Sequence, residues 1–273
     1  MRKFLLIGFS LLSINVFSTP GDTIDTFTLE GQPKEGLHGL AYDPEDGNIW
    51  CAGPNATDDC YFCKFKNIPP HDIVQNWQKL QNMRRVYDIA YPYDYYGTDT
   101  IVAVDSTAPR IKIYNKNNGS NLSYLSSDPF GGSTVGIDSN KFDKLSLYSS
   151  GASSSYFIKK WTGSSWDNWT TSGYYPLGIA FGWNHVFVIH NEPTNSIWVF
   201  NLDSTKYSEI KLKNWGSTYM YGLCRGRDNV VYSNETLYTT CEYPSIVIKE
   251  IEIGDYNTDI ETSSIGDIKA IFH

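Results

Sequence analysis

Apolar residues in this chain gather in short runs that are separated by turn-forming residues. The stretch from 177 to 213 is the clearest example, because Leu177–Phe181 is followed by His185–His190, Ser196–Asn201 and Tyr207–Lys213. The runs are rich in Val, Ile, Phe, Tyr and Trp, and residues 191–195 between two of them read Asn-Glu-Pro-Thr-Asn. Runs of this length and composition between turn residues predict β-strands. This stretch therefore predicts four successive strands.

A short motif opens each group of strands. It reads His-Gly-Leu-Ala-Tyr at 38–42 and returns with variations at 87–91, 135–138, 177–181, 221–224 and, in degenerate form, 265–268. Successive copies lie 42 to 49 residues apart. A period in the forties with only strand-like content inside it is typical of the four-stranded blades of a β-propeller. The sequence therefore predicts an all-β chain that forms a single β-propeller.

The other units contain further strand-like runs at the places that this plan requires. They are Thr100–Val104 and Arg110–Tyr114 in the second unit, Leu145–Ser149 and Tyr156–Trp161 in the third, and Leu237–Glu242 and Ser245–Ile253 in the fifth. The second position of the motif is usually glycine, because the innermost strands converge on the central channel, where a Cβ would crowd its neighbours. Asp88 departs from this rule. An acidic residue at a channel-lining position is either a solvated channel residue or part of a site.

Units that start near residues 38, 87, 135, 177 and 221 predict five four-stranded blades in one domain over residues 19–273. The fifth unit lacks a convincing fourth strand, whereas Thr23–Glu30 alternates in polarity as a strand does. We therefore predict that this N-terminal strand closes the ring by completing the last blade, which pairs two otherwise open edges. The segment 265–272 could instead supply that strand or begin an incomplete sixth blade, so six blades is the alternative.

Composition and charge narrow the function classes. Of the 273 residues, 19% are charged, and the chain has 22 Gly and 20 Tyr. A helical bundle would need long stretches rich in Ala, Glu, Lys and Leu, and a disordered chain would need more charge. The formal net charge of −8 deprives phosphate-backbone binding of its usual electrostatic driving force. We expect no nucleic-acid partner, and we expect a monomer.

Residues 1–18 have the pattern of a signal peptide. Arg2 and Lys3 precede the apolar stretch Phe4–Phe17, and Val16 and Ser18 stand where signal peptidase prefers small side chains. The apolar run is too short to span a bilayer, and no later stretch approaches about 20 apolar residues. The sequence predicts cleavage near Ser18 and a protein that is secreted, periplasmic or displayed at the cell surface, without a membrane span.

The five cysteines, Cys51, Cys60, Cys63, Cys224 and Cys241, fit an exported protein. An oxidising compartment permits disulfides, and the odd count leaves at least one thiol without a partner cysteine in the chain. We predict a bridge between Cys224 and Cys241, on neighbouring strands of the fifth unit, and a second from Cys51 to Cys63 or Cys60. The Cys60–Cys63 spacing alone does not make a zinc site, because no second Cys pair or His pair completes it.

The first unit carries a family resemblance. Gly36–Trp50 reads GLHGLAYDPEDGNIW and resembles the repeat of the NHL and streptogramin-lyase-like β-propellers, in which an Asp-Pro-x-x-Gly turn joins two strands. Asp43 and Pro44 start that turn, and Gly47 supplies a residue able to take a positive φ. Glu35 and Gly36 are similar to the first metal-ligand segment of the lactonase propellers of the SMP-30 kind, although Leu37 stands where that family has Pro. The resemblance implies the propeller fold, and such propellers host many functions.

Ligands of β-propellers usually bind at one mouth of the channel, between the loops that enter the innermost strands and those that join the second and third strands. The residues that this rule selects are Arg85, Tyr87, Asp88, Asp105, Tyr175, His190, Glu192, Tyr219 and Tyr221. They predict a pocket with aromatic walls and a few polar groups, suited to a sugar or a small organic ligand.

Two function classes follow from this candidate site. We favour a secreted, non-catalytic binding module that holds a glycan, a peptide or a surface partner at the channel rim and needs no cofactor. The alternative is a metal-assisted lactonase or lyase, which would use rim His and carboxylate side chains and a divalent metal ion.

Overall fold

A computed structural model of the chain contains twenty strands and, among the residues that it describes, no helix. The described residues are 19–55, 59–93, 96–97, 99–108, 110–125, 128–130, 134–139, 147–151, 157–171, 176–190, 195–215, 219–227, 235–242, 245–254 and 256. The predicted signal peptide at 1–18 and the predicted strand at 265–272 lie outside them. No helix of the described part is long and apolar enough to cross a membrane.

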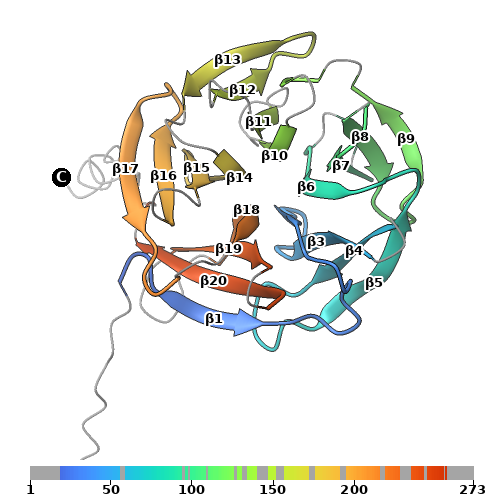
Figure 1. The fold of residues 1–273 in the computed structure, drawn as a ribbon, viewed down its shortest axis with the longest axis horizontal. Helices are drawn as coiled ribbons and strands as arrows, with labels where there is room; N and C mark the ends of the chain where they lie inside the picture. The colour runs from blue at the N-terminus through green and yellow to red at the C-terminus, as the bar shows by residue number, and fades with distance from the viewer. Residues whose placement is uncertain are drawn as a thin grey trace, which may run out of the picture.

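The strands form five antiparallel sheets of four strands, arranged as the blades of a β-propeller around a central channel (Figure 1). Blade 1 contains β2 (Gly39–Tyr42), β3 (Ile49–Pro54), β4 (Cys60–Phe65) and β5 (Ile73–Leu80). Blade 2 contains β6 (Val86–Ala90), β7 (Thr100–Asp105), β8 (Ile111–Asn115) and β9 (Asn121–Tyr124). Blade 3 contains β10 (Thr134–Ser139), β11 (Leu147–Gly151), β12 (Phe157–Trp161) and β13 (Trp166–Thr171). Blade 4 contains β14 (Pro176–Gly182), β15 (His185–His190), β16 (Ser196–Asn201) and β17 (Lys206–Lys211).

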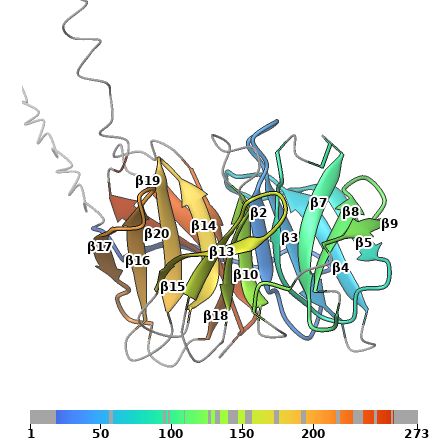
Figure 2. The same ribbon diagram turned by 90° about the horizontal axis from the view of Figure 1, so that it is seen from above.

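Blade 5 joins the two ends of the described chain. It contains β18 (Met220–Arg225), β19 (Glu235–Cys241), β20 (Val247–Gly254) and, as its outermost strand, the N-terminal β1 (Thr23–Phe27). Strand β1 runs antiparallel to β20, with Thr23 opposite Ile251 and Phe27 opposite Ile248. The prediction that an N-terminal strand completes the last blade is therefore confirmed, and the ring has five blades, not six. The strands run between the two faces of the ring (Figure 2).

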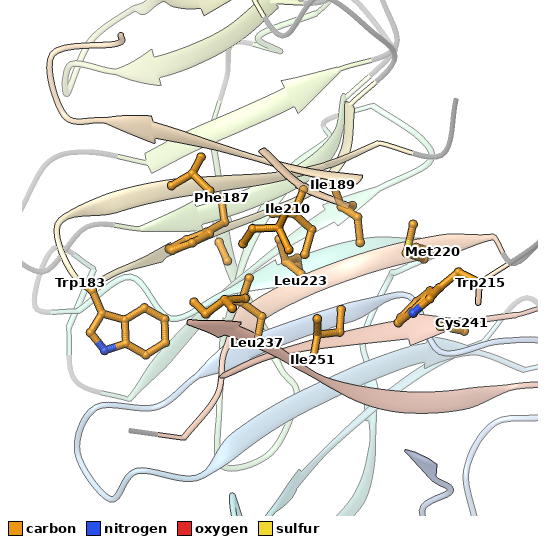
Figure 3. Close-up of a cluster of buried hydrophobic side chains, with 14 residues drawn as sticks. Trp183, Phe187, Ile189, Ile210, Trp215, Met220, Leu223, Leu237, Cys241 and Ile251 are labelled. Carbon is orange, nitrogen blue, oxygen red and sulfur yellow. The ribbon is translucent and has the colours of Figure 1, made fainter. Parts of the chain in front are cut away.

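Five hydrophobic clusters fill the five interfaces between neighbouring blades. The cluster between blades 4 and 5 brings Phe187 and Ile189 of β15 against Leu237 of β19 and Ile251 of β20 (Figure 3). The other clusters lie between blades 1 and 2, 5 and 1, 2 and 3, and 3 and 4. Each sheet is therefore apolar on both faces, which explains why the inner and middle strands are continuous apolar runs in the sequence.

The glycines of the repeated motif allow the innermost strands to approach one another. A Cβ built on Gly222 would lie 2.1 Å from the carbonyl oxygen of His38 in blade 1, and one on Gly178 would lie 2.2 Å from that of Tyr221 in blade 5. Both atoms belong to the backbone of the next blade, so they cannot move aside as a flexible side chain would. The requirement for glycine at this position, predicted from the repeat, has this steric cause.

The cysteine predictions are wrong in one case and unsupported in the other, because all five cysteines are free thiols and buried. Cys224 packs in the cluster between blades 5 and 1, whereas Cys241 packs in the cluster between blades 4 and 5. Their side chains point to opposite faces of blade 5 and cannot bridge. Cys51 does lie opposite Cys63 across the β3–β4 pair, but no bond joins them, and Cys60 faces the other side of blade 1.

Candidate functional site at the channel mouth

One residue from each blade stands immediately before the glycine position of the motif, where the chain enters the innermost strand. In blades 2 to 5 these residues are Tyr87, Val135, Leu177 and Tyr221, and each lies at a register shift between the first and second strands of its blade. Such β-bulges re-aim a side chain that would otherwise follow the regular alternation of the strand. The four residues line a cavity of about 140 Å³, here called the mouth cavity.

His38 takes the corresponding place in blade 1. Its backbone N–H donates to Ala52, which continues the pairing of β2 with β3 by one residue. The imidazole lies between the two tyrosine rings, with centroid separations of 4.7 Å to Tyr221 and 6.4 Å to Tyr87. The side chain is fully buried behind these rings.

A proton is fixed between His38 and Glu242. Nδ1 of His38 lies 2.7 Å from the carbonyl oxygen of Val86, which can only accept, so Nδ1 carries a hydrogen. Nε2 forms a hydrogen-bonded ion pair with a carboxylate oxygen of Glu242. A neutral imidazole has one N–H, so two acceptors require either an imidazolium with a carboxylate or a shared proton.

Glu242 is the ionised member of that pair. Burial raises the pKa of its carboxyl, but the hydrogen bond and charge of His38, the Tyr221 hydroxyl and the charge of Arg85 outweigh burial and hold the pKa below its usual range. Burial and the neighbouring Glu242 carboxylate raise the pKa of Tyr221 to about 12. Tyr221 is therefore a neutral phenol that donates to Glu242, and the carboxylate is oriented from two sides.

Asp105 holds the loop that carries Arg84 and Arg85. Its buried carboxylate accepts hydrogen bonds from the backbone N–H groups of Arg84 at 3.4 Å and Arg85 at 3.3 Å, and it pairs with Lys112. The carbonyl of Arg85 in turn accepts from the N–H of Ser106 at 2.9 Å. The two arginine side chains are exposed, yet the backbone beneath them is fixed.

These arginines line a second concavity next to the mouth cavity. Arg84, Arg85, Glu35 and Pro54 surround a hollow of about 300 Å³, here called the arginine hollow. The guanidinium of Arg85 lies 5.9 Å from the centroid of the Tyr87 ring, and Tyr87 lines the mouth cavity. Arg85 therefore lines the arginine hollow and contacts a residue that lines the mouth cavity.

Two aspartates lie deeper in the channel. Asp88 is fully buried and accepts backbone N–H groups from Leu40 at 3.3 Å, Ile89 at 2.9 Å and Ile137 at 3.1 Å, so it links the inner strands of three blades. Burial raises the pKa of Asp88 well above its usual range, against the effect of these donors. Asp88 braces the inner strands and is not open to a ligand.

Asp138 makes the same kind of link between blades 3 and 4. Its carboxylate accepts from the N–H of Phe181 at 2.6 Å and from that of Ser139 at 2.8 Å. The residue as a whole is half-buried. Burial raises the pKa of Asp138 to about 7.

The predicted site residues divide into three groups. Arg85, Tyr87 and Tyr221 meet at the mouth, and Tyr219 is exposed beside them, its carbonyl accepting the N–H of Glu242. Asp88, Asp105 and His190 are fully buried, and the ring of His190 lies 5.0 Å from that of Trp198 inside blade 4. Tyr175 and Glu192 lie outside the described residues.

Sequence reasoning missed Glu242 and its pairing with His38. Glu242 directly follows the second strand of blade 5, so the rule that selected His190 at the end of β15 also applies to it. In the described part of the chain, no group of three or more His, Cys, Asp or Glu side chains is placed to hold a metal ion.

Neither a protein-family model nor a curated protein matches this chain. The resemblance to the NHL and SMP-30 propellers therefore stays a prediction. The fold is similar to that of a glutaminyl cyclase from Myxococcus xanthus, with a TM-score of 0.57 and 7% identity over 86% of this chain and 97% of that one. It is also similar to the tail fibre of Staphylococcus aureus phage P68, with a TM-score of 0.54 and 9% identity over 87% of this chain. The match spans 54% of the tail-fibre chain, and at these identities both similarities concern the fold alone.

Proposed function

We propose that this protein is a non-catalytic binding module that holds one sugar ring of a glycan in the mouth cavity. The observation that carries the proposal is the re-aiming of four side chains by four bulges at equivalent positions, so that Tyr87 and Tyr221 flank a pre-oriented His38–Glu242 pair. Bulges at corresponding places in four blades direct side chains of different types, Tyr, Val and Leu, toward one cavity, while the backbone that carries them is held rigidly by the sheets. A binding site needs side chains that are held in this way.

The chemistry of the mouth suits a sugar. Tyrosine rings offer an apolar face for the C–H side of a sugar, and hydroxyl groups find acceptors on Glu242 and donors on Arg85 and the tyrosines. A cavity of about 140 Å³ is below the size of sites for drug-sized ligands, so one ring of a longer ligand fits the available space. The polar groups are held in place before binding, so little ordering opposes association.

The location that we propose for this activity is based on residues 1–18. Their pattern favours export, so the ligand would be met outside the cytoplasm. The protein would act as a monomer on a glycan, with a peptide or a protein partner as the competing ligand classes.

The proposal is tested with a glycan and peptide array, followed by calorimetry on each hit. Tyr87→Ala and Tyr221→Ala should each weaken binding by about ten-fold or more, because each removes an aromatic wall of the cavity. Tyr124→Ala is the matched control, since Tyr124 is exposed on β9 at the outside of blade 2. If the affinity for a ligand is unchanged in Tyr87→Ala and Tyr221→Ala, and both variants melt like the parent, then the ligand binds at another surface of the protein.

The metal-assisted lactonase or lyase stays the alternative prediction. Native mass spectrometry of the full chain before and after chelation tests it, because that chemistry requires a bound divalent ion.

A further inference from the structure

Most basic side chains of the described part of the chain are paired with a carboxylate. The pairs include Lys64 with Asp43, Lys66 with Asp72, Lys79 with Asp59, Lys112 with Asp105, Lys116 with Glu45, Lys213 with Asp22 and Arg227 with Glu250. Arg84 and Arg85 are neighbours at the channel mouth, and neither guanidinium forms an ion pair with any described residue. In a chain of net charge −8, two adjacent cations without an ion-pair partner among the described residues are a candidate anion-binding group.

The charges around the mouth do not cancel this surplus. Glu242 is bonded to His38 and is not among the residues that line the arginine hollow. Glu35 lines the hollow, and its exposed carboxylate forms no ion pair within 4 Å in the described part of the chain. Two arginines and one carboxylate therefore leave a surplus of one positive charge in the lining. The guanidinium of Arg85 lies 5.9 Å from the ring centroid of Tyr87, a residue that lines the mouth cavity, so its positive charge is close to that cavity.

The position of the arginines is also fixed. Asp105 accepts both of their backbone N–H groups, and Ser106 donates to the carbonyl of Arg85. This clamp uses a buried carboxylate that is itself neutralised by Lys112, so its own charge does not oppose an anion outside. A guanidinium is a planar fork of donors that matches carboxylate and sulfate oxygens.

We infer that the ligand is an anionic sugar, whose ring occupies the mouth cavity while its carboxylate or sulfate group binds Arg85 and Arg84 in the arginine hollow. This inference rests on the proposed sugar-binding function and adds its charge specificity. Tyr87 links the two contacts, because it lines the mouth cavity and carries the Arg85 guanidinium over its ring. A neutral sugar would make the aromatic contacts and the hydroxyl hydrogen bonds, but it would form no charge-paired hydrogen bond with the arginines.

The test uses the full chain and calorimetry with four probes: galacturonate oligosaccharides, glucuronate oligosaccharides, sulfated galactose oligosaccharides and the neutral galactose oligosaccharides. At least one anionic probe should bind about ten-fold or more tightly than its neutral counterpart. The preferred probe tells carboxylate from sulfate. Raising the salt concentration from about 0.05 to about 0.5 M should weaken anionic binding and leave neutral binding nearly unchanged.

Variants then assign the effect to the arginines. Arg85→Gln should remove most of the preference for the anionic probe, Arg84→Gln should remove part of it, and Arg85→Lys should give an intermediate value because it keeps the charge and loses the fork. Lys211→Gln is the charge-matched control, since Lys211 is exposed on β17 at the outside of blade 4. Melting curves of each variant verify folding.

The outcomes separate the two levels of the proposal. Equal binding of anionic and neutral sugars that is lost in Tyr221→Ala overturns the charge specificity and leaves the sugar site standing. Anionic binding that is unchanged in both glutamine variants also overturns the inference. If no sugar probe binds, both the inference and the proposed function fail.

Discussion

The carboxyl of Asp138 should make the stability of the ring depend on pH. Burial raises its pKa from 3.8 to about 7 in the folded protein, whereas the unfolded chain exposes it to water. The folded state therefore favours the protonated form. Its contribution to the free energy of unfolding is fully present below about pH 3.8 and is lost as the pH rises through about 7.

The size of the effect follows from the two pKa values. A rise from 3.8 to about 7 corresponds to up to about 4 kcal/mol over the whole range, of which about 2–3 kcal/mol falls between pH 5 and pH 8. Asp88 acts in the same direction, because burial also raises its pKa. Glu242 acts in the opposite direction, since its lowered pKa gives stability that is lost as the pH falls.

The assay is urea unfolding of the parent and of Asp138→Asn at about pH 5 and about pH 8. The asparagine cannot ionise, so the variant should lose less stability than the parent between these two pH values. Asparagine also keeps only one acceptor for the N–H groups of Phe181 and Ser139, so the variant should be less stable at pH 5. The diagnostic quantity is therefore the difference between the two pH values.

Asp203→Asn is the control, because Asp203 is exposed and hydrogen bonds from Thr205 lower the pKa of its carboxyl. The control variant should lose as much free energy of unfolding between about pH 5 and about pH 8 as the parent does. Equal losses in the parent and in Asp138→Asn would refute the assignment of a raised pKa to this carboxyl.

Two further predictions concern the ring itself. Gly222→Ala should lower the free energy of unfolding by about 1–3 kcal/mol or more, because its Cβ would lie 2.1 Å from the carbonyl oxygen of His38. Gly182→Ala, whose Cβ would meet only the flexible side chain of Arg225 at 3.5 Å, should cost far less in the same urea titration. Deleting residues 19–31, which removes β1 from the edge of β20, should lower the melting temperature far more than a surface change such as Thr28→Ala. A truncated protein that melts like the parent would contradict the role of β1 in closing the ring.

The sequence was sufficient for the architecture because it carries two clear signals: a motif glycine that returns in four of the five blades, and the alternating pattern of the N-terminal strand. The motif glycine must be small wherever inner strands touch, as the 2.1 Å approach at Gly222 illustrates, so it returns at a regular interval. Thr23–Glu30 alternates in polarity because β1 is an outer strand with one wet face, and this marked it as the strand that closes the ring.

The prediction of a Cys224–Cys241 disulfide failed for a related reason. Register is read from sequence through the contrast between a buried and an exposed face, and β19 has all seven residues buried. Without that contrast, nothing in the sequence places Cys241 opposite Met220 or Cys224 opposite Tyr238, so the opposite orientations of the two thiols were not visible.

The candidate site shows the same limit of sequence reasoning, because the direction of a side chain was again not predictable. It also shows that different residues hold the fold and line the cavity. His190 and Glu242 both stand at the end of a second strand, but one side chain is buried beside Trp198 and the other reaches the mouth. A position rule selects both and cannot distinguish them, because the direction of a side chain at a strand end depends on its neighbours. In the first strand of blade 5, by contrast, the register shift includes Tyr221 and Gly222, so Gly222 packs on blade 1 while Tyr221 lines the mouth cavity. The residue that the packing constrains and the residue that lines the cavity are adjacent in the chain, so a substitution at Tyr221 changes the mouth without changing the contact of Gly222 with blade 1.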